Sequence, residues 1–184
     1  SSDLSPTTTE HPVLGFHGVF DSQANVDAAT SLVREILPRV RVMVPETEVL
    51  LAGRRPPREV RRLVGDGVEL RADVADLRPT LDEMSVHVDW MTSGAGIKNK
   101  VLEAMAAGRP VVASPAGAQG IGAGAGLVVA EDFDSAAAEI VWLLNDPGLL
   151  RTAGAAARAR VVEDFRWSGN ARAIEALWER VARS

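Results

Sequence analysis

The sequence has no cysteine and no tyrosine, and aromatic residues make up only 4% of its 184 residues. Without cysteine the chain has no disulfides, no thiolate metal sites and no thiol nucleophile. Its three histidines, His11, His17 and His87, are well separated and show no metal-ligand spacing. We therefore expect no bound metal.

Long apolar runs and an excess of positive charge are also missing. No stretch approaches the roughly 20 apolar residues needed to cross a bilayer, and the first ten residues lack the basic and apolar parts of a signal peptide. The formal net charge is -5, so nucleic acid and anionic membranes exert no general electrostatic attraction. We expect a cytoplasmic protein with no nucleic-acid partner and no membrane span.

The chain is organised as a tail followed by one domain. Residues 1–11 are mostly polar and are predicted to be a flexible tail or linker. The sequence begins without methionine, so we expect it to be a piece of a longer protein. From residue 12 to 184, short apolar runs bounded by Gly, Pro or Asp alternate with stretches of helical period.

This alternation predicts an α/β fold, a Rossmann-like doubly wound parallel sheet of about six strands with C-terminal helices. Ligands of such folds bind outside the carboxyl ends of the strands. The predicted strands are residues 13–17, 48–52, 68–71, 85–89, 110–113 and 127–130. The predicted helices are residues 25–42, 57–64, 76–84, 98–107, 134–144, 147–163 and 168–182.

The strongest functional pattern is a glycine loop, with Gly94 and Gly96, that leads from a strand into the helix at 98–107. The amino end of a helix offers unpaired N–H groups and a partial positive charge, which together hold a phosphate. The only two lysines of the chain, Lys98 and Lys100, fall in the first turn of this helix, where the macrodipole disfavours cations unless an anion is near. Glu103 lies one turn further, on the face of Lys100, where a carboxylate accepts hydrogen bonds from a ribose diol.

Purely structural interpretations of these residues remain open. Both lysines can be solvated, and Glu103 can be an intrahelical partner of either lysine. His17 and His87 fall on predicted strands, where core histidines with satisfied hydrogen bonds are more frequent than catalytic ones. Asp89, at a strand end near the glycine loop, is a candidate donor contact.

The run from Gly94 to Val112 resembles the donor-side signature of the retaining glycosyltransferases with two Rossmann-like domains, the GT-B group 1 family. The helix Glu103-Ala104-Met105-Ala106 followed by Gly108-Arg109-Pro110-Val111-Val112 is the specific part of this resemblance. Weaker similarity covers almost all of the chain beyond the tail, at residues 15–18, 25–28, 143–147 and 165–167.

The resemblance implies the C-terminal half of such an enzyme. This half would bind a nucleoside-diphosphate sugar for transfer to an acceptor held by an N-terminal domain. It implies that Glu103 contacts the donor ribose and that no cofactor or obligatory metal is needed. It further implies polysaccharide biosynthesis, an inactive isolated fragment, and peripheral membrane contact only through the N-terminal domain. The high content of Arg and Ala with only two lysines suggests a bacterial source. The donor-binding residues that the resemblance implies are Gly94, Gly96, Ile97, Lys98, Asn99, Lys100 and Glu103.

The sequence departs from the family pattern in two places. Ala95 stands where many members have an acidic residue near the transferred sugar. The usual basic pair that reaches the diphosphate is not evident. Arg54, after the second predicted strand, is our candidate substitute, and Gly18, after the first, is a candidate for close approach of the ligand to the backbone.

Three alternatives remain beside a transferase. The same donor architecture serves epimerases and phosphorylases, and a decayed site would leave a non-catalytic nucleotide-binding or interaction module. A dinucleotide-dependent oxidoreductase is disfavoured, because no Gly-x-Gly-x-x-Gly turn follows the first predicted strand.

Overall fold

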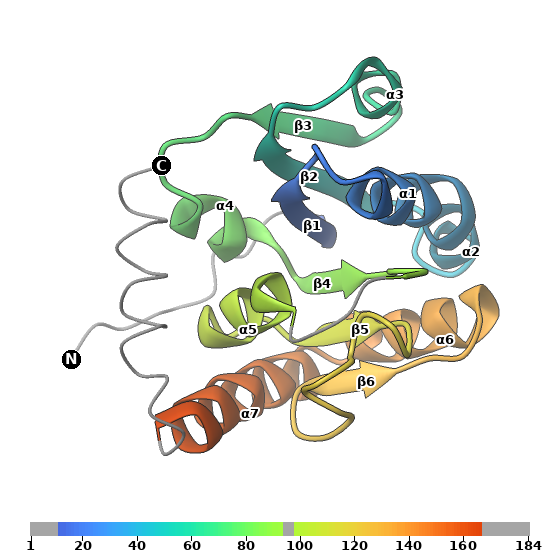
Figure 1. The fold of residues 1–184 in the computed structure, drawn as a ribbon. Helices are drawn as coiled ribbons and strands as arrows, with labels where there is room; N and C mark the ends of the chain where they lie inside the picture. The colour runs from blue at the N-terminus through green and yellow to red at the C-terminus, as the bar shows by residue number, and fades with distance from the viewer. Residues whose placement is uncertain (1–10, 94–97, 167–184) are drawn as a thin grey trace.

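A computed structural model describes residues 11–93 and 98–166 of the protein. Within this part of the chain, six parallel strands form one sheet in the order β3-β2-β1-β4-β5-β6 (Figure 1). The strands are β1 Val13–Val19, β2 Glu48–Arg54, β3 Val68–Ala72, β4 Val86–Asp89, β5 Val111–Ala113 and β6 Leu127–Val129. Their number, order and direction confirm the predicted doubly wound fold.

Helices follow most of the strands and cover both faces of the sheet (Figure 1). No helix within the described ranges is long and apolar enough to cross a membrane. The predicted helix at 168–182 lies outside the described residues. The helices are α1 Gln23–Ser31, η1 Leu32–Ile36, α2 Leu37–Arg41, α3 Arg58–Arg61, α4 Arg78–Glu83, α5 Asn99–Ala106, α6 Phe133–Asn145 and α7 Pro147–Arg166.

The apolar core is divided by the sheet into two layers. On one face, Leu14, Leu51 and Val88 pack with buried residues of α1, α2 and α6. On the other face, α5 and α7 pack over β5 and β6, while α4 packs beside Val13 and Leu50. Because successive side chains of a strand point to opposite faces, β1, β2, β5 and β6 contribute apolar residues to both layers.

The helix predicted at 25–42 is interrupted by a π-helical turn, η1, which joins α1 to α2. Pro38 explains the interruption, because proline has no N–H with which to continue the α-helical hydrogen-bond ladder. The backbone N–H of Leu37 instead bonds to the carbonyl of Leu32, five residues earlier. The chain thus keeps its direction across the proline.

The helix predicted at 57–64 is shorter than expected, since α3 ends at Arg61. A tight turn follows it, in which the backbones of Gly65 and Val68 bond to each other in both directions. The turn places Gly65, Asp66 and Gly67 at positive φ, a region that a right-handed helix does not visit. This turn starts β3 and stops the helix.

Candidate functional site

The sheet order places the topological switch point between the carboxyl ends of β1 and β4, and we call this place the β1/β4 crevice. The two strands are neighbours at the centre of the sheet. After β1 the chain turns into α1 on one face, and after β4 it leads to α5 on the other face. Such a point, where the connections diverge, is where open α/β sheets bind their ligands.

Glu103 of α5 reaches this crevice and contacts a histidine of β1. The distance from His17 Nε2 to Glu103 Oε2 is 2.7 Å, which is typical of a charge-assisted hydrogen bond. The His17 side chain is 4% exposed and that of Glu103 is 17% exposed. The carboxylate therefore lies at the edge of the interior, where it is bonded to the buried His17 and partly exposed to solvent.

His87 of β4 completes a chain of three side chains. Its Nε2 lies 3.0 Å from His17 Nδ1, and its ring is fully buried. Burial lowers the pKa of His87 well below its usual value, and the positive charge of Lys100 adds to the effect. His87 is therefore neutral and carries a single ring proton.

The hydrogen bonds assign the positions of the protons. Since an ionised carboxylate only accepts, His17 carries a proton on Nε2 and donates it to Glu103. In the neutral form of His17, Nδ1 is the acceptor of the Nε2–H of His87. The remaining nitrogen, His87 Nδ1, has no hydrogen-bond partner among the described residues, as suits an unprotonated nitrogen in an apolar setting.

The side chain of Lys100 extends from the first turn of α5 to residues of α1, β1 and β4. Its Nζ donates to Asn25 Oδ1 of α1, lies 3.4 Å from the sulfur of Met91 and stands over the ring of Phe16. It also lies 3.5 Å from Asp89 Oδ1 at the end of β4. Burial lowers the pKa of Lys100, and Asp89 partly offsets this effect.

Of the residues expected to bind the donor, Gly94, Gly96 and Ile97 lie outside the described residues. Lys98 is buried and Asn99 is exposed. No side chain caps the amino end of α5, where Lys98 is the N-cap, so this end retains the amide groups on which the phosphate hypothesis depends.

Gly18 and Arg54 both lie at the carboxyl edge of the sheet. They lie on neighbouring strands, offset by one residue, since Gly18 pairs with Gly53 and Arg54 follows Gly53. Asn25 covers Gly18, because a Cβ built on Gly18 would lie 3.2 Å from Asn25 Nδ2. Arg54 is exposed, and its side chain has no partner in the part of the chain that the structure describes. Their roles in binding remain predictions.

The structure corrects two of the structural interpretations. The lysines are not solvated, because Lys98 is 8% exposed and the Lys100 side chain 13% exposed. Among the described residues, Glu103 bonds to His17, from a different element, and not to a lysine of its own helix. The two histidines are core residues as expected, but only His17 has both ring nitrogens bonded.

Sequence reasoning missed His17 as the partner of Glu103 and Asp89 as the partner of Lys100. Strand alternation carried a usable signal, since Val86 and Val88 point to one face and His87 and Asp89 to the other. What the sequence lacked was the register of β1 against β4, which pairs Gly15 with His87. Among the described residues, no group of three or more histidine and acidic side chains is placed to hold a metal.

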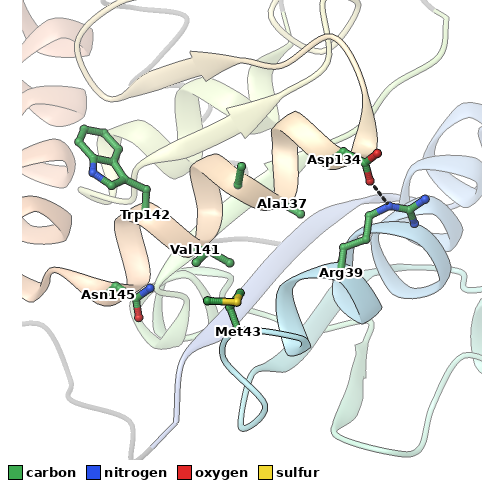
Figure 2. A pocket seen from close by; sticks show the side chains of 8 residues that line it. Arg39, Met43, Asp134, Ala137, Val141, Trp142 and Asn145 are labelled. Atoms are coloured by element: carbon green, nitrogen blue, oxygen red, sulfur yellow. Dashed lines mark hydrogen bonds and ion pairs between the residues drawn. The ribbon is translucent and has the colours of Figure 1, made fainter.

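A second concavity lies on the other face, between α2 and α6 (Figure 2). It has a volume of about 520 Å³ and is lined by apolar side chains, including Met43, Val141 and Trp142. The ion pair of Arg39 with Asp134, 2.7 Å between Nε and Oδ1, stands at one end (Figure 2). His17, Glu103 and Lys100 are not among the residues that line this groove.

Comparison with solved structures shows the same fold in several glycosyltransferases. TarM of S. aureus aligns with all of the chain at 18% identity and a TM-score of 0.70. HepE of Anabaena aligns with 92% of the chain at 18% identity and a TM-score of 0.69. The C-terminal domain of the glycosyl transferase LpcC from Francisella tularensis aligns with 84% of the chain at 16% identity and a TM-score of 0.63.

The chain spans 38% of the length of TarM and 48% of that of HepE, but 86% of the LpcC domain. No curated protein sequence matches it. The family profile described as glycosyl transferases group 1 matches residues 11–146. Because this match covers most of the sequence and confirms the resemblance seen around Glu103, the chain belongs to the glycosyl transferases group 1 family.

Proposed function

We propose that this chain is the donor-binding domain of a glycosyltransferase and binds a nucleoside-diphosphate sugar in the β1/β4 crevice. The observation that carries the proposal is the carboxylate of Glu103, fixed by His17 at the edge of this crevice one turn inside α5. One carboxylate oxygen accepts from His17, and the other is available to the two hydroxyls of a ribose.

The diphosphate would lie at the amino end of α5. Uncapped amide groups there, together with the positive charge of Lys98 and the nearby Lys100, favour a bound anion. During transfer, negative charge develops on the leaving diphosphate, and pre-placed N–H groups and cations stabilise it. Protein cations thus take the part that a metal plays in other transferases.

The whole enzyme would include an N-terminal domain that holds the acceptor. TarM and HepE, which the chain covers by less than half, have been crystallised in complexes with UDP, and this supports a nucleotide donor. We extend the proposal to a retaining transfer, to cytoplasmic polysaccharide synthesis in a bacterium, and to a fragment that has no turnover by itself.

Calorimetric titration of the chain with UDP, GDP and ADP tests the proposal. One of the three nucleotides should bind, and Glu103→Ala and the double variant Lys98→Ala/Lys100→Ala should each lose that binding. Glu163→Ala, which removes an exposed carboxylate from α7, is the matched control and should bind as the unmodified chain does.

Failure of all three nucleotides to bind would contradict the proposal and would favour a non-catalytic interaction module. Binding that survives in Glu103→Ala would contradict the assigned ribose contact. An epimerase or phosphorylase would give the same binding results, and product analysis of the full-length enzyme separates these from a transferase.

A further inference from the structure

We propose that His17 is a positioning residue, which orients the carboxylate of Glu103 so that its free oxygen faces the donor ribose. This inference rests on the proposed function and deepens it. It assigns to β1 a part in donor binding that comes from a side chain 86 residues away from Glu103 in sequence.

The first reason is that burying the two histidines of this three-residue chain is unfavourable. His17 and His87 are 3% and 0% exposed, at strand positions where an aliphatic side chain would pack without any need for hydrogen bonds. Burying two imidazoles is unfavourable unless their polar atoms find partners. His87 Nδ1 remains without one among the described residues, so the arrangement does not maximise stability. Among the described residues, the hydrogen-bonded pair of histidines has Glu103 as its one other side-chain partner.

The second reason is that the arrangement is directional. The buried His87 is neutral and has one ring proton; placed on Nε2, this proton is donated to His17 Nδ1, and the proton of His17 is then on Nε2. A hydrogen bond to one nitrogen of a histidine fixes what its other nitrogen does. His17 is thereby held as a donor to Glu103 Oε2.

The third reason is the setting of the carboxylate. A glutamate side chain at the edge of a cleft has several rotatable bonds, and ordering it upon ligand binding has an entropic cost. Glu103 is 17% exposed and already fixed by the 2.7 Å contact with His17. The carboxylate is therefore pre-ordered, and the ribose meets it with less loss of freedom.

Two substitutions at position 17 separate positioning from packing. His17→Gln places an amide N–H near the place of Nε2 and keeps a donor for Glu103, whereas His17→Asn reaches only to the place of Nδ1 and loses it. Both are neutral amides of similar size. Their melting temperatures and circular dichroism spectra report whether each has folded.

The ligand test compares the nucleoside diphosphate that binds, from UDP, GDP and ADP, with its 2′,3′-dideoxy counterpart. His17→Asn should weaken binding of the ribonucleotide about tenfold, the usual effect of losing a hydrogen bond to a charged group, and leave the dideoxy analogue unaffected. His17→Gln should restore most of the loss. In Glu103→Ala, His17→Asn should have no additional effect.

Equal weakening of both nucleotides by His17→Asn, or no weakening of either, overturns the positioning role while the proposed function stands, provided that Glu103→Ala discriminates between them. If the unmodified chain binds none of the nucleotides, the proposed function and the positioning role of His17 are both wrong. Should His17→Asn fail to fold, nitrogen-15 histidine spectra of the unmodified chain decide. The His17 Nε2–H signal should shift in Glu103→Gln and upon nucleotide addition, and a signal unmoved by nucleotide overturns the inference.

Discussion

Lys100 and Asp89 form a buried pair of opposite charges, with 3.5 Å between Nζ and Oδ1, at the carboxyl end of β4. The Asp89 side chain is 0% exposed, and neither of its oxygens accepts a hydrogen bond from a described residue. At this length the contact is an ion pair without a well-formed hydrogen bond. The pair joins the end of β4 to the first turn of α5.

Removing only one partner of this pair should destabilise the chain. Lys100→Met leaves the Asp89 carboxylate buried without a cation, and the expected loss is about 3 kcal/mol of unfolding free energy. The double variant Lys100→Met/Asp89→Val, which removes both charges, should recover much of the loss. Urea unfolding measures all three chains.

The exposed Arg151 of α7 gives the control, because Arg151→Met also removes a cation and should change the unfolding free energy by less than about 0.5 kcal/mol. If the effects of Lys100→Met and Asp89→Val simply add, the two groups do not interact and the pairing is wrong.

Stability should depend on pH through Asp89. Burial raises the pKa of Asp89 above 3.8, and the positive charge of Lys100 reduces the shift. Between 3.8 and the raised value, the folded state binds more protons at this group than the unfolded state does, so its contribution to stability falls as pH rises. Acid-range unfolding curves detect this trend.

Comparison with Asp89→Asn isolates the contribution of Asp89 from that of carboxylates such as Glu83, whose pKa is lowered by Arg71 and which act in the opposite direction. The unmodified chain should lose stability relative to Asp89→Asn as pH rises above 3.8. A constant difference between the two chains at all pH values would show that Asp89 titrates normally.

Two glycines at the centre of the sheet should differ in their tolerance of a methyl group. A Cβ on Gly53 would lie 1.9 Å from the backbone oxygen of Gly18, and one on Gly15 would lie 2.0 Å from the sulfur of Met84. Neighbouring backbone cannot move aside as a flexible side chain can. Gly15→Ala should therefore cost about 1–3 kcal/mol, and Gly53→Ala more.

Thermal or urea unfolding of Gly15→Ala and Gly53→Ala measures which variant loses more unfolding free energy. The double variant Gly15→Ala/Met84→Ala should lose less stability than the two single losses combined, since removing the Met84 sulfur makes room for the methyl group. Equal costs at Gly15 and Gly53 would mean that the strands adjust as easily as the methionine does.

Arg54 should contribute to nucleotide affinity. Its exposed guanidinium, at the carboxyl end of β2, is free of partners in the described part of the chain, whereas the neighbouring Arg55 is paired with Asp21. Arg54→Ala should weaken binding of the nucleoside diphosphate about tenfold, as expected for loss of a charge-assisted contact.

Arg62→Ala is the matched control, because Arg62 is also exposed and follows α3 in the same connection. Titration calorimetry at low and high salt should show that only the Arg54 effect shrinks as salt screens the charge. Unchanged affinity in Arg54→Ala removes this residue from the donor site.

The fold could be predicted from the sequence because its elements are encoded locally. Apolar runs such as 48–52 and helical stretches such as 134–144 appear in the structure within a few residues of their predicted limits. Where the prediction was inaccurate, the cause was a local feature, such as the π-helical turn before Pro38 or the tight turn at residues 65–68.

The sequence by itself determined that Glu103 and both lysines would share the first turns of one helix at the carboxyl edge of a parallel sheet, since helical period and chain alternation are local properties. Only the tertiary structure decided that His17 would hold Glu103 and that Asp89 would hold Lys100. These contacts depend on which strands become neighbours and in what register, and that choice is made by packing of the whole core.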